Sequence, residues 1–278
     1  MIVVTGATGN VGREAVRLLA AAGEPVRALV RHAPASMPAE VDVVTGDFDD
    51  AGSLDRALRG ADTVVLISPA VPQQEIALID VARSAGVSHV VKITSKASPR
   101  SPVERRRGQA VIEAHLQASG LDWTLLRNNA YQQNLLTLAP AVRASRSFAM
   151  SAGDGEVGMV DARDVAAVAV QVATSPSAHI GRTYWPTGPQ LVTYGDVADA
   201  LSDTVGLPVT YRRVTPDDHL QLMISAGVPT PVAQSNAHAF RLIGDGDAAW
   251  VTDDVSTLTG TTPRTMREFI TQHRSSFV

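Results

Sequence analysis

The chain has 278 residues and a formal net charge of −4, with 45% hydrophobic and 19% charged residues. No apolar stretch approaches the roughly 18 to 20 residues that a membrane span needs, and no basic run is longer than Arg105–Arg107. The lack of cysteine excludes disulfides, thiolate metal sites, Fe–S clusters and cysteine nucleophiles. We therefore expect a globular cytoplasmic protein with no metal site and no nucleic-acid or membrane partner, in which redox chemistry requires a bound cofactor.

The N-terminal half alternates short β-branched runs with amphipathic stretches, a pattern typical of βαβ units and a parallel sheet. Strands are predicted at residues 2–5, 26–30, 42–45, 63–68, 89–94 and 123–127. Helices are predicted between them at residues 13–22, 51–59, 74–85 and 106–118. The pattern indicates an α/β fold of Rossmann type, with a doubly wound parallel sheet. Because the first strand starts at residue 2, we expect no leader peptide.

Beyond residue 127 the pattern loosens, because glycine and proline become frequent. Helical patterns recur at residues 163–174, 194–205, 216–226, 231–242 and 263–275. We interpret residues 1–150 as a dinucleotide-binding domain. Residues 151–278 would supply the last sheet elements and a small α/β lobe on the substrate side, in one compact unit with the first part. The helix at 216–226 could roof an apolar pocket or be plain core, and a homodimer stays possible.

Three glycines, Gly6, Gly9 and Gly12, follow the first predicted strand and directly precede an amphipathic helix. The first permits a tight turn, the second lets backbone N–H groups approach a pyrophosphate, and the third lets the helix pack closely on the strand. The phosphates then sit at the helix N-terminus. The remaining predicted contacts in this turn are Thr8, Asn10 and Val11.

The end of the second strand distinguishes the two nicotinamide cofactors. An acidic residue there binds the ribose 2′-hydroxyl of NAD(H), whereas an arginine pairs with the 2′-phosphate of NADP(H). This strand ends at Arg31, and no carboxylate occurs between Glu24 and Glu40. The sequence therefore predicts NADP(H), with Arg31 as the phosphate clamp and Arg13 as a second candidate. A solvated surface arginine is the alternative.

The ends of the later strands complete the predicted cofactor site. Asp47, which follows the third strand, could accept a hydrogen bond from the adenine amino group or cap the next helix. The ends of parallel strands meet at one edge, where open α/β sheets bind ligands. The other cofactor candidates at these ends are Phe48, Ile67, Ser68, Thr94, Ser95 and Asn128.

Together these segments resemble the NmrA-like atypical short-chain dehydrogenases/reductases, close to the NADPH-dependent quinone oxidoreductase type. The matching segments are residues 5–12, Arg31, residues 46–48, residues 119–128, Asn134 and residues 161–166. The resemblance implies an NADP(H)-binding Rossmann fold. It also implies one of two roles, because some members reduce quinones by hydride transfer and others bind NADP(H) as redox-sensing regulators.

The catalytic pair of ordinary short-chain dehydrogenases is missing. Those enzymes protonate the substrate carbonyl with a tyrosine whose pKa is lowered by a lysine four residues later. Here Ser88 lies four residues before Lys92, and Lys92 lies four residues before Lys96. This absence fits the NmrA-like group. A quinone needs less help than a ketone, because its reduced oxyanion is a stabilised phenolate that water can protonate.

The leading hypothesis is an NADPH-dependent oxidoreductase for a quinone or similar conjugated acceptor, small and apolar or aromatic. Lys96 and Tyr131 are the candidate catalytic residues. Lys96 could instead point to solvent or pair with Glu113, Tyr131 could be a packing aromatic, and Arg105–Arg107 is interpreted as a solvated helix start. Two other functions stay open: a non-catalytic NADP(H)-sensing regulator, and a tailoring reductase or auxiliary protein of aromatic polyketide metabolism.

Overall fold

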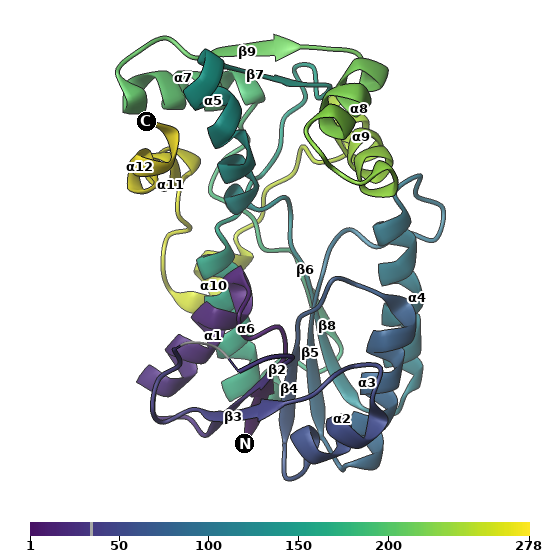
Figure 1. Ribbon diagram of the computed structural model, residues 1–278. Coiled ribbons are helices and arrows are strands. Elements are labelled where there is room, and N and C mark those ends of the chain that lie inside the picture. The colour runs from purple at the N-terminus through teal and green to yellow at the C-terminus, as the bar shows by residue number, and fades with distance from the viewer. Residues whose placement is uncertain (34–35) are drawn as a thin grey trace.

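A seven-stranded parallel sheet forms the main layer of the computed structural model, which describes residues 1–33 and 36–278 (Figure 1). Its order is β3-β2-β1-β4-β5-β6-β8, with every neighbouring pair parallel. The first six strands follow the Rossmann order, which confirms the predicted fold class. The strands are β1 (Ile2–Val4), β2 (Val26–Val30), β3 (Asp42–Thr45), β4 (Thr63–Leu66), β5 (His89–Thr94), β6 (Asp122–Arg127) and β8 (Arg182–Tyr184).

Helices cover both faces of this sheet (Figure 1). One face carries α1 (Asn10–Ala21), α6 (Ala162–Thr174) and α10 (Asp254–Thr259). The other carries α2 (Ala51–Leu58), α3 (Pro72–Ser84) and α4 (Glu104–Ala118). Side chains alternate between the faces, so that Val4 packs in the first core and Val3 in the second. Over residues 1–33 and 36–278 no helix is both long and apolar enough to cross a bilayer.

A separate core holds together what we call the lobe, which lies above the sheet in Figure 1. Its sheet has two parallel strands, and the rings of Phe148 and Tyr211 stack there with centroids 5.4 Å apart. Its elements are η1 (Gln132–Leu138), α5 (Ala139–Ser145), β7 (Ser147–Met150), α7 (Tyr194–Val205), β9 (Thr210–Arg213), α8 (Pro216–Ser225), α9 (Thr230–Gly244), α11 (Met266–Gln272) and α12 (Arg274–Phe277). A short 3₁₀ turn, η2 (Pro176–Ala178), precedes β8.

Several elements differ from the sequence prediction. The helix expected at 263–275 begins at Met266, because Thr265 and Glu268 form a capping box, and it is interrupted at His273. The sequence prediction gives no ranges for the short elements β7, β8, β9, α5 and α10, because they have too few residues to show a period. β7 lies before residue 150 and pairs with β9 after it, while β8 joins the main sheet. The division at residue 150 stays a prediction.

The helix predicted at 216–226 is α8, and it is not plain core. It packs against α9, and His219 is its buried residue. The His219 Nδ1 atom lies 3.3 Å from the Ser151 amide nitrogen, and its ring lies 4.9 Å from that of Phe240. Burial lowers the pKa of His219, so the imidazole is neutral and accepts the Ser151 N–H at neutral pH. Within the lobe, His219 therefore links α8 both to the residue that follows β7 and to α9.

Candidate functional site

The turn between β1 and α1 can be built only from glycine at two positions. Gly6 has φ +55°, and a Cβ there would lie 2.8 Å from the Ile67 carbonyl oxygen. A Cβ at Gly12 would collide with the Gly6 carbonyl oxygen, so the first turn of α1 lies directly on the loop. Gly9 is the N-cap of α1, and no side chain caps this end of the helix. Because α1 and the end of β4 both lie so close to the loop, glycine is required at this spacing.

The start of α1 offers unpaired amide groups to an anion. The first intrahelical bond is the Arg13 N–H to the Gly9 carbonyl, at 3.0 Å. The N–H groups of Asn10, Val11 and Gly12 precede it and have no partner within the helix. No acidic residue occupies this first turn, so the positive end of the helix dipole is not neutralised. The turn therefore fits a dinucleotide pyrophosphate.

The predicted residue Ile67 meets the glycine turn. The Thr5 hydroxyl donates to the Ile67 carbonyl at 2.7 Å and accepts from the Ile67 N–H at 2.8 Å. These bonds join the ends of β1 and β4, between which the strand order reverses direction. Open α/β sheets bind ligands at such a switch point.

The loop after β4 is anchored by a buried ion pair. The Ser68 hydroxyl donates to Glu75 Oε1 at 2.6 Å and accepts from the Ala70 N–H at 3.0 Å. Glu75 and Lys92 are both fully buried, with Lys92 Nζ 2.8 Å from Glu75 Oε2. Ala70 has φ +65°, a left-handed conformation that alanine rarely adopts, and the anchored loop holds it there. Sequence reasoning missed Glu75, although a lysine inside the apolar strand β5 signals a buried anion.

The predicted adenosine contacts lie at the ends of β2 and β3. Arg31 is exposed, and no hydrogen bond to it occurs in the described part of the chain. Asp47 is also exposed and accepts the Asp49 N–H at 3.0 Å. The cap of α2 is Asp50, so the helix-cap alternative for Asp47 is wrong. Phe48 packs half-buried against the core on the α2 side.

The ends of β5 and β6 meet α4 through a buried carboxylate. The Thr94 hydroxyl donates to Glu113 at 2.8 Å, and the Arg127 guanidinium also binds Glu113. Arg127 lies 5.2 Å from the ring centroid of Trp185, which meets Trp250 edge-on at 5.4 Å. The Thr94 side chain is thus oriented toward α4. From Glu113 a row of contacting side chains, Arg127, Trp185 and Trp250, extends along the same edge of the sheet.

Tyr131 and Asn128 are brought together after β6. The Tyr131 hydroxyl donates to Asn128 Oδ1 at 3.2 Å, and Asn128 Nδ2 donates to the Asn129 carbonyl at 2.9 Å. Burial raises the pKa of the Tyr131 phenol well above its ordinary value, although the Arg105 guanidinium and the Asn128 bond act in the opposite direction. The phenol is therefore protonated at neutral pH and acts as a hydrogen-bond donor.

Lys96 has a partner that the sequence did not suggest. Its Nζ donates to the Asp247 carboxylate at 2.8 Å and to the Asp247 carbonyl at 3.0 Å, and Arg106 binds the same carboxylate at 2.6 Å. Burial opposes the ionisation of Asp247, but these two cations outweigh it and lower the pKa of the carboxyl. Both alternatives for Lys96, free in solvent or paired with Glu113, are wrong.

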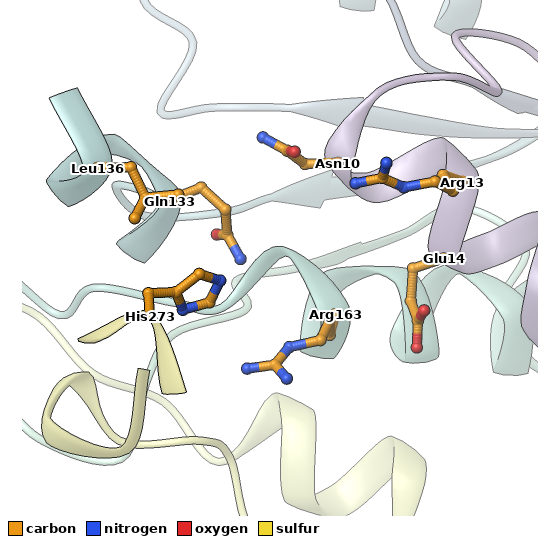
Figure 2. Close-up of a pocket in the computed structure, with 7 residues that line it drawn as sticks. All are labelled: Asn10, Arg13, Glu14, Gln133, Leu136, Arg163 and His273. Atoms are coloured by element: carbon orange, nitrogen blue, oxygen red, sulfur yellow. The ribbon is translucent and has the colours of Figure 1, made fainter. Parts of the chain in front are cut away.

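A cavity of about 250 Å³ opens beside the N-terminus of α1 (Figure 2). It is lined by Asn10, Arg13, Glu14, Gln133, Leu136, Arg163 and His273. Arg13 points into this cavity, which Arg31 does not line. Asn10 is the lining residue that also belongs to the glycine turn. Among the residues that the structure describes, no acidic and histidine side chains gather in a group that could hold a metal ion.

Two further polar side chains of this region are buried with an oxygen that has no partner, and the first of them, Gln109, was missed from sequence. Gln109, on α4, is 5% exposed, and its Oε1 has no donor. The predicted cofactor residue Ser95 follows β5, and its hydroxyl is likewise buried without a partner. Buried polar atoms without a partner are costly, so both atoms are available to a ligand.

Comparison with known proteins assigns the chain to a family. It is 39% identical to an NAD(P)H azoreductase of Xenophilus azovorans, over 100% of this chain and 99% of the relative. It is 37% identical to a (4-alkanoyl-5-oxo-2,5-dihydrofuran-3-yl)methyl phosphate reductase of Streptomyces griseus, with the same coverage. The structure of an NADPH-dependent quinone oxidoreductase from Escherichia coli with NADPH matches with a TM-score of 0.88 and 29% identity, covering 98% and 99% of the two chains. The NmrA-like family profile matches residues 1–270, and the chain belongs to the NmrA-like family.

Proposed function

We propose that this protein is an NADPH-dependent oxidoreductase that transfers hydride to a quinone or a similar conjugated, small aromatic acceptor. One observation carries the proposal. The glycine turn lies at the same edge of the sheet as the polar side chains that follow β5 and β6, which are Thr94, Asn128 and Tyr131. The cofactor is NADP(H), which fits the free amides of α1 and the exposed Arg31. The relatives named above as NAD(P)H-dependent or solved with NADPH support this cofactor.

The chain's own residues have separable tasks. The amides at the start of α1 hold the pyrophosphate, and Arg31 pairs with the 2′-phosphate. When bound, the nicotinamide supplies the hydride. Tyr131, whose phenol stays protonated, donates its one hydrogen bond to the acceptor in place of Asn128 Oδ1 when the acceptor binds. Because its raised pKa makes it a weak acid, it suits an acceptor whose reduced anion is already delocalised. Lys96, fixed by Asp247, adds positive charge on the same side.

The relatives widen the acceptor class without changing the reaction type. The name of the Xenophilus relative describes a reductase of azo compounds, and the name of the Streptomyces relative describes a reductase of a phosphate ester. Both names describe small organic acceptors, which supports a reductase of small conjugated molecules over a protein-binding regulator. A tailoring role in secondary metabolism stays within this proposal, since it concerns the identity of the acceptor.

The test is NADPH oxidation by the purified protein across a panel of quinones, azo dyes and enones. We expect turnover with at least one class, and a loss of turnover in Tyr131→Phe that exceeds any change in NADPH affinity. Tight binding of NADPH with no turnover of any acceptor would contradict the proposal and favour the sensor, which must bind NADP⁺ and NADPH unequally.

A further inference from the structure

The first turn of α4 presents one arginine without a partner. Arg106 binds Asp247, and Arg107 donates to the Ser101 carbonyl at 2.7 Å. Arg105 lies between Glu104 and these two, and its side chain is exposed. No hydrogen bond or ion pair to Arg105 occurs within residues 1–33 and 36–278. The expected solvated helix start therefore consists of two engaged arginines and one free one.

The helix register directs Arg105 toward the ends of the central strands. Arg105, Gln109 and Glu113 are four residues apart, so they share one face of α4. Glu113 binds Thr94 and Arg127 at the ends of β5 and β6, which fixes the direction of that face. Gln109, one turn nearer Arg105, is buried and its Oε1 has no donor. This face of α4 therefore extends from Glu113, at the strand ends, to the unpaired guanidinium of Arg105.

Arg105 and Tyr131 influence each other's ionisation. Burial by the surrounding protein lowers the pKa of Arg105 although solvent still reaches the side chain, and the nearby Tyr131 acts in the opposite direction. The same guanidinium acts on the pKa of Tyr131. The exposed Arg105 guanidinium has no counter-ion in the described structure, so its N–H donors are free to bind an anionic ligand.

We propose that Arg105 determines specificity by binding an oxyanion substituent of the acceptor, a sulfonate, carboxylate or phosphate, while Tyr131 contacts the reducible group. A guanidinium can bind such a group through two parallel N–H bonds. Lys96 and Arg106 already bind the Asp247 carboxylate and Arg107 binds a carbonyl, so Arg105 is the arginine of this helix turn whose donors are free for the ligand. The inference rests on the proposed function for the identity of the reducible group.

The test compares two azo dyes that differ by one charge, a phenylazonaphthol and its para-sulfonated form. In Arg105→Gln we expect the ratio of kcat/KM for the sulfonated dye to kcat/KM for the neutral dye to fall about tenfold to hundredfold, mainly through KM. A loss of kcat/KM that affects both dyes equally cancels in this ratio. Arg105→Lys should restore part of it, because the charge returns without the paired donors. Arg100→Gln, which removes an exposed arginine that has no hydrogen bond in the described structure, should leave the ratio within twofold. An unchanged ratio in Arg105→Gln would overturn the inference.

A binding experiment separates this inference from the proposed function. Naphthalene sulfonate, which cannot be reduced, is titrated into the protein with saturating NADP⁺ and followed by calorimetry, with neutral naphthalene methanol as the comparison. We expect Arg105→Gln to weaken sulfonate binding about tenfold or more and to leave the neutral compound within twofold. If no dye is reduced yet this loss occurs, the anion site stands and the proposed function fails. Equal affinities in wild type and Arg105→Gln would overturn the anion site, and thermal melts show that the variant is folded.

Discussion

The cofactor half and the acceptor half of this site are held in different ways. The glycine turn is built from neighbouring residues, and its shape depends on backbone atoms at Gly6, Gly9 and Gly12. The acceptor half depends on side chains from distant segments, since Lys96 and Asp247 are 151 residues apart. A local backbone motif can be recognised in sequence, whereas a site assembled from distant side chains cannot. Four substitutions test this contrast, from the largest expected effect to the smallest.

Breaking the buried ion pair should cost the most. Glu75→Gln leaves the Lys92 ammonium uncompensated in a fully buried position, so we expect the free energy of unfolding to fall by about 3 to 5 kcal/mol. Urea denaturation measures this loss. The double variant Glu75→Gln with Lys92→Met should recover most of it, because the buried charge is removed. If the double variant is as unstable as the single one, the pair is not the cause.

Removing the phosphate clamp should act on one cofactor alone. Arg31→Gln is expected to weaken NADPH binding by about tenfold to hundredfold, because an ionic hydrogen bond to the 2′-phosphate is lost, and to leave NADH binding within twofold. Fluorescence titration of both cofactors measures the difference. Arg13→Gln is the matched variant, and we expect no change because Arg13 faces the cavity of Figure 2. A loss confined to Arg13→Gln would reverse the two roles.

Filling the glycine turn should harm both stability and cofactor binding. In Gly12→Ala the added Cβ collides with the Gly6 carbonyl, and we expect a loss of about 1 to 3 kcal/mol in stability together with weaker NADPH binding. Gly52→Ala adds the same methyl group on α2, where its nearest neighbour is the Asp50 carboxylate at 3.3 Å. That control should bind NADPH normally. Normal binding by Gly12→Ala would contradict the role of the turn.

The contact between Lys96 and Asp247 should have the smallest effect, and it depends on pH. Because the folded protein lowers the pKa of Asp247, its stabilising contribution is present above the ordinary aspartate pKa of about 3.9 and is lost as the pH falls below it. Asp247→Asn should therefore lose about 0.2 to 1 kcal/mol at neutral pH, and the difference from wild type should vanish in acid. Unfolding curves across this range test the sign. A difference that persists in acid would exclude the carboxylate as its source.

Much of the fold and of the cofactor turn could be predicted because those features are local. The six strands of the Rossmann order follow from β-branched runs, and the glycine spacing follows from backbone contacts. The partner of Lys96 could not be predicted, because nothing near residue 96 encodes Asp247. The sequence predicts three solvated arginines at 105–107, because only the fold shows that Arg106 and Arg107 have partners. The roles of Lys96 and Tyr131 in the reaction stay predictions.

The edge-on pair formed by Trp185 and Trp250 gives the protein an optical reporter of its own. Of the three tryptophans in the chain, these two lie together, and Trp185 lies under the guanidinium that also binds Glu113. Trp123 stands near the opposite end of β6 from Arg127. Changes in emission on adding a ligand can therefore be assigned to the strand ends by replacing Trp123 alone, so that occupancy can be followed without a label or turnover.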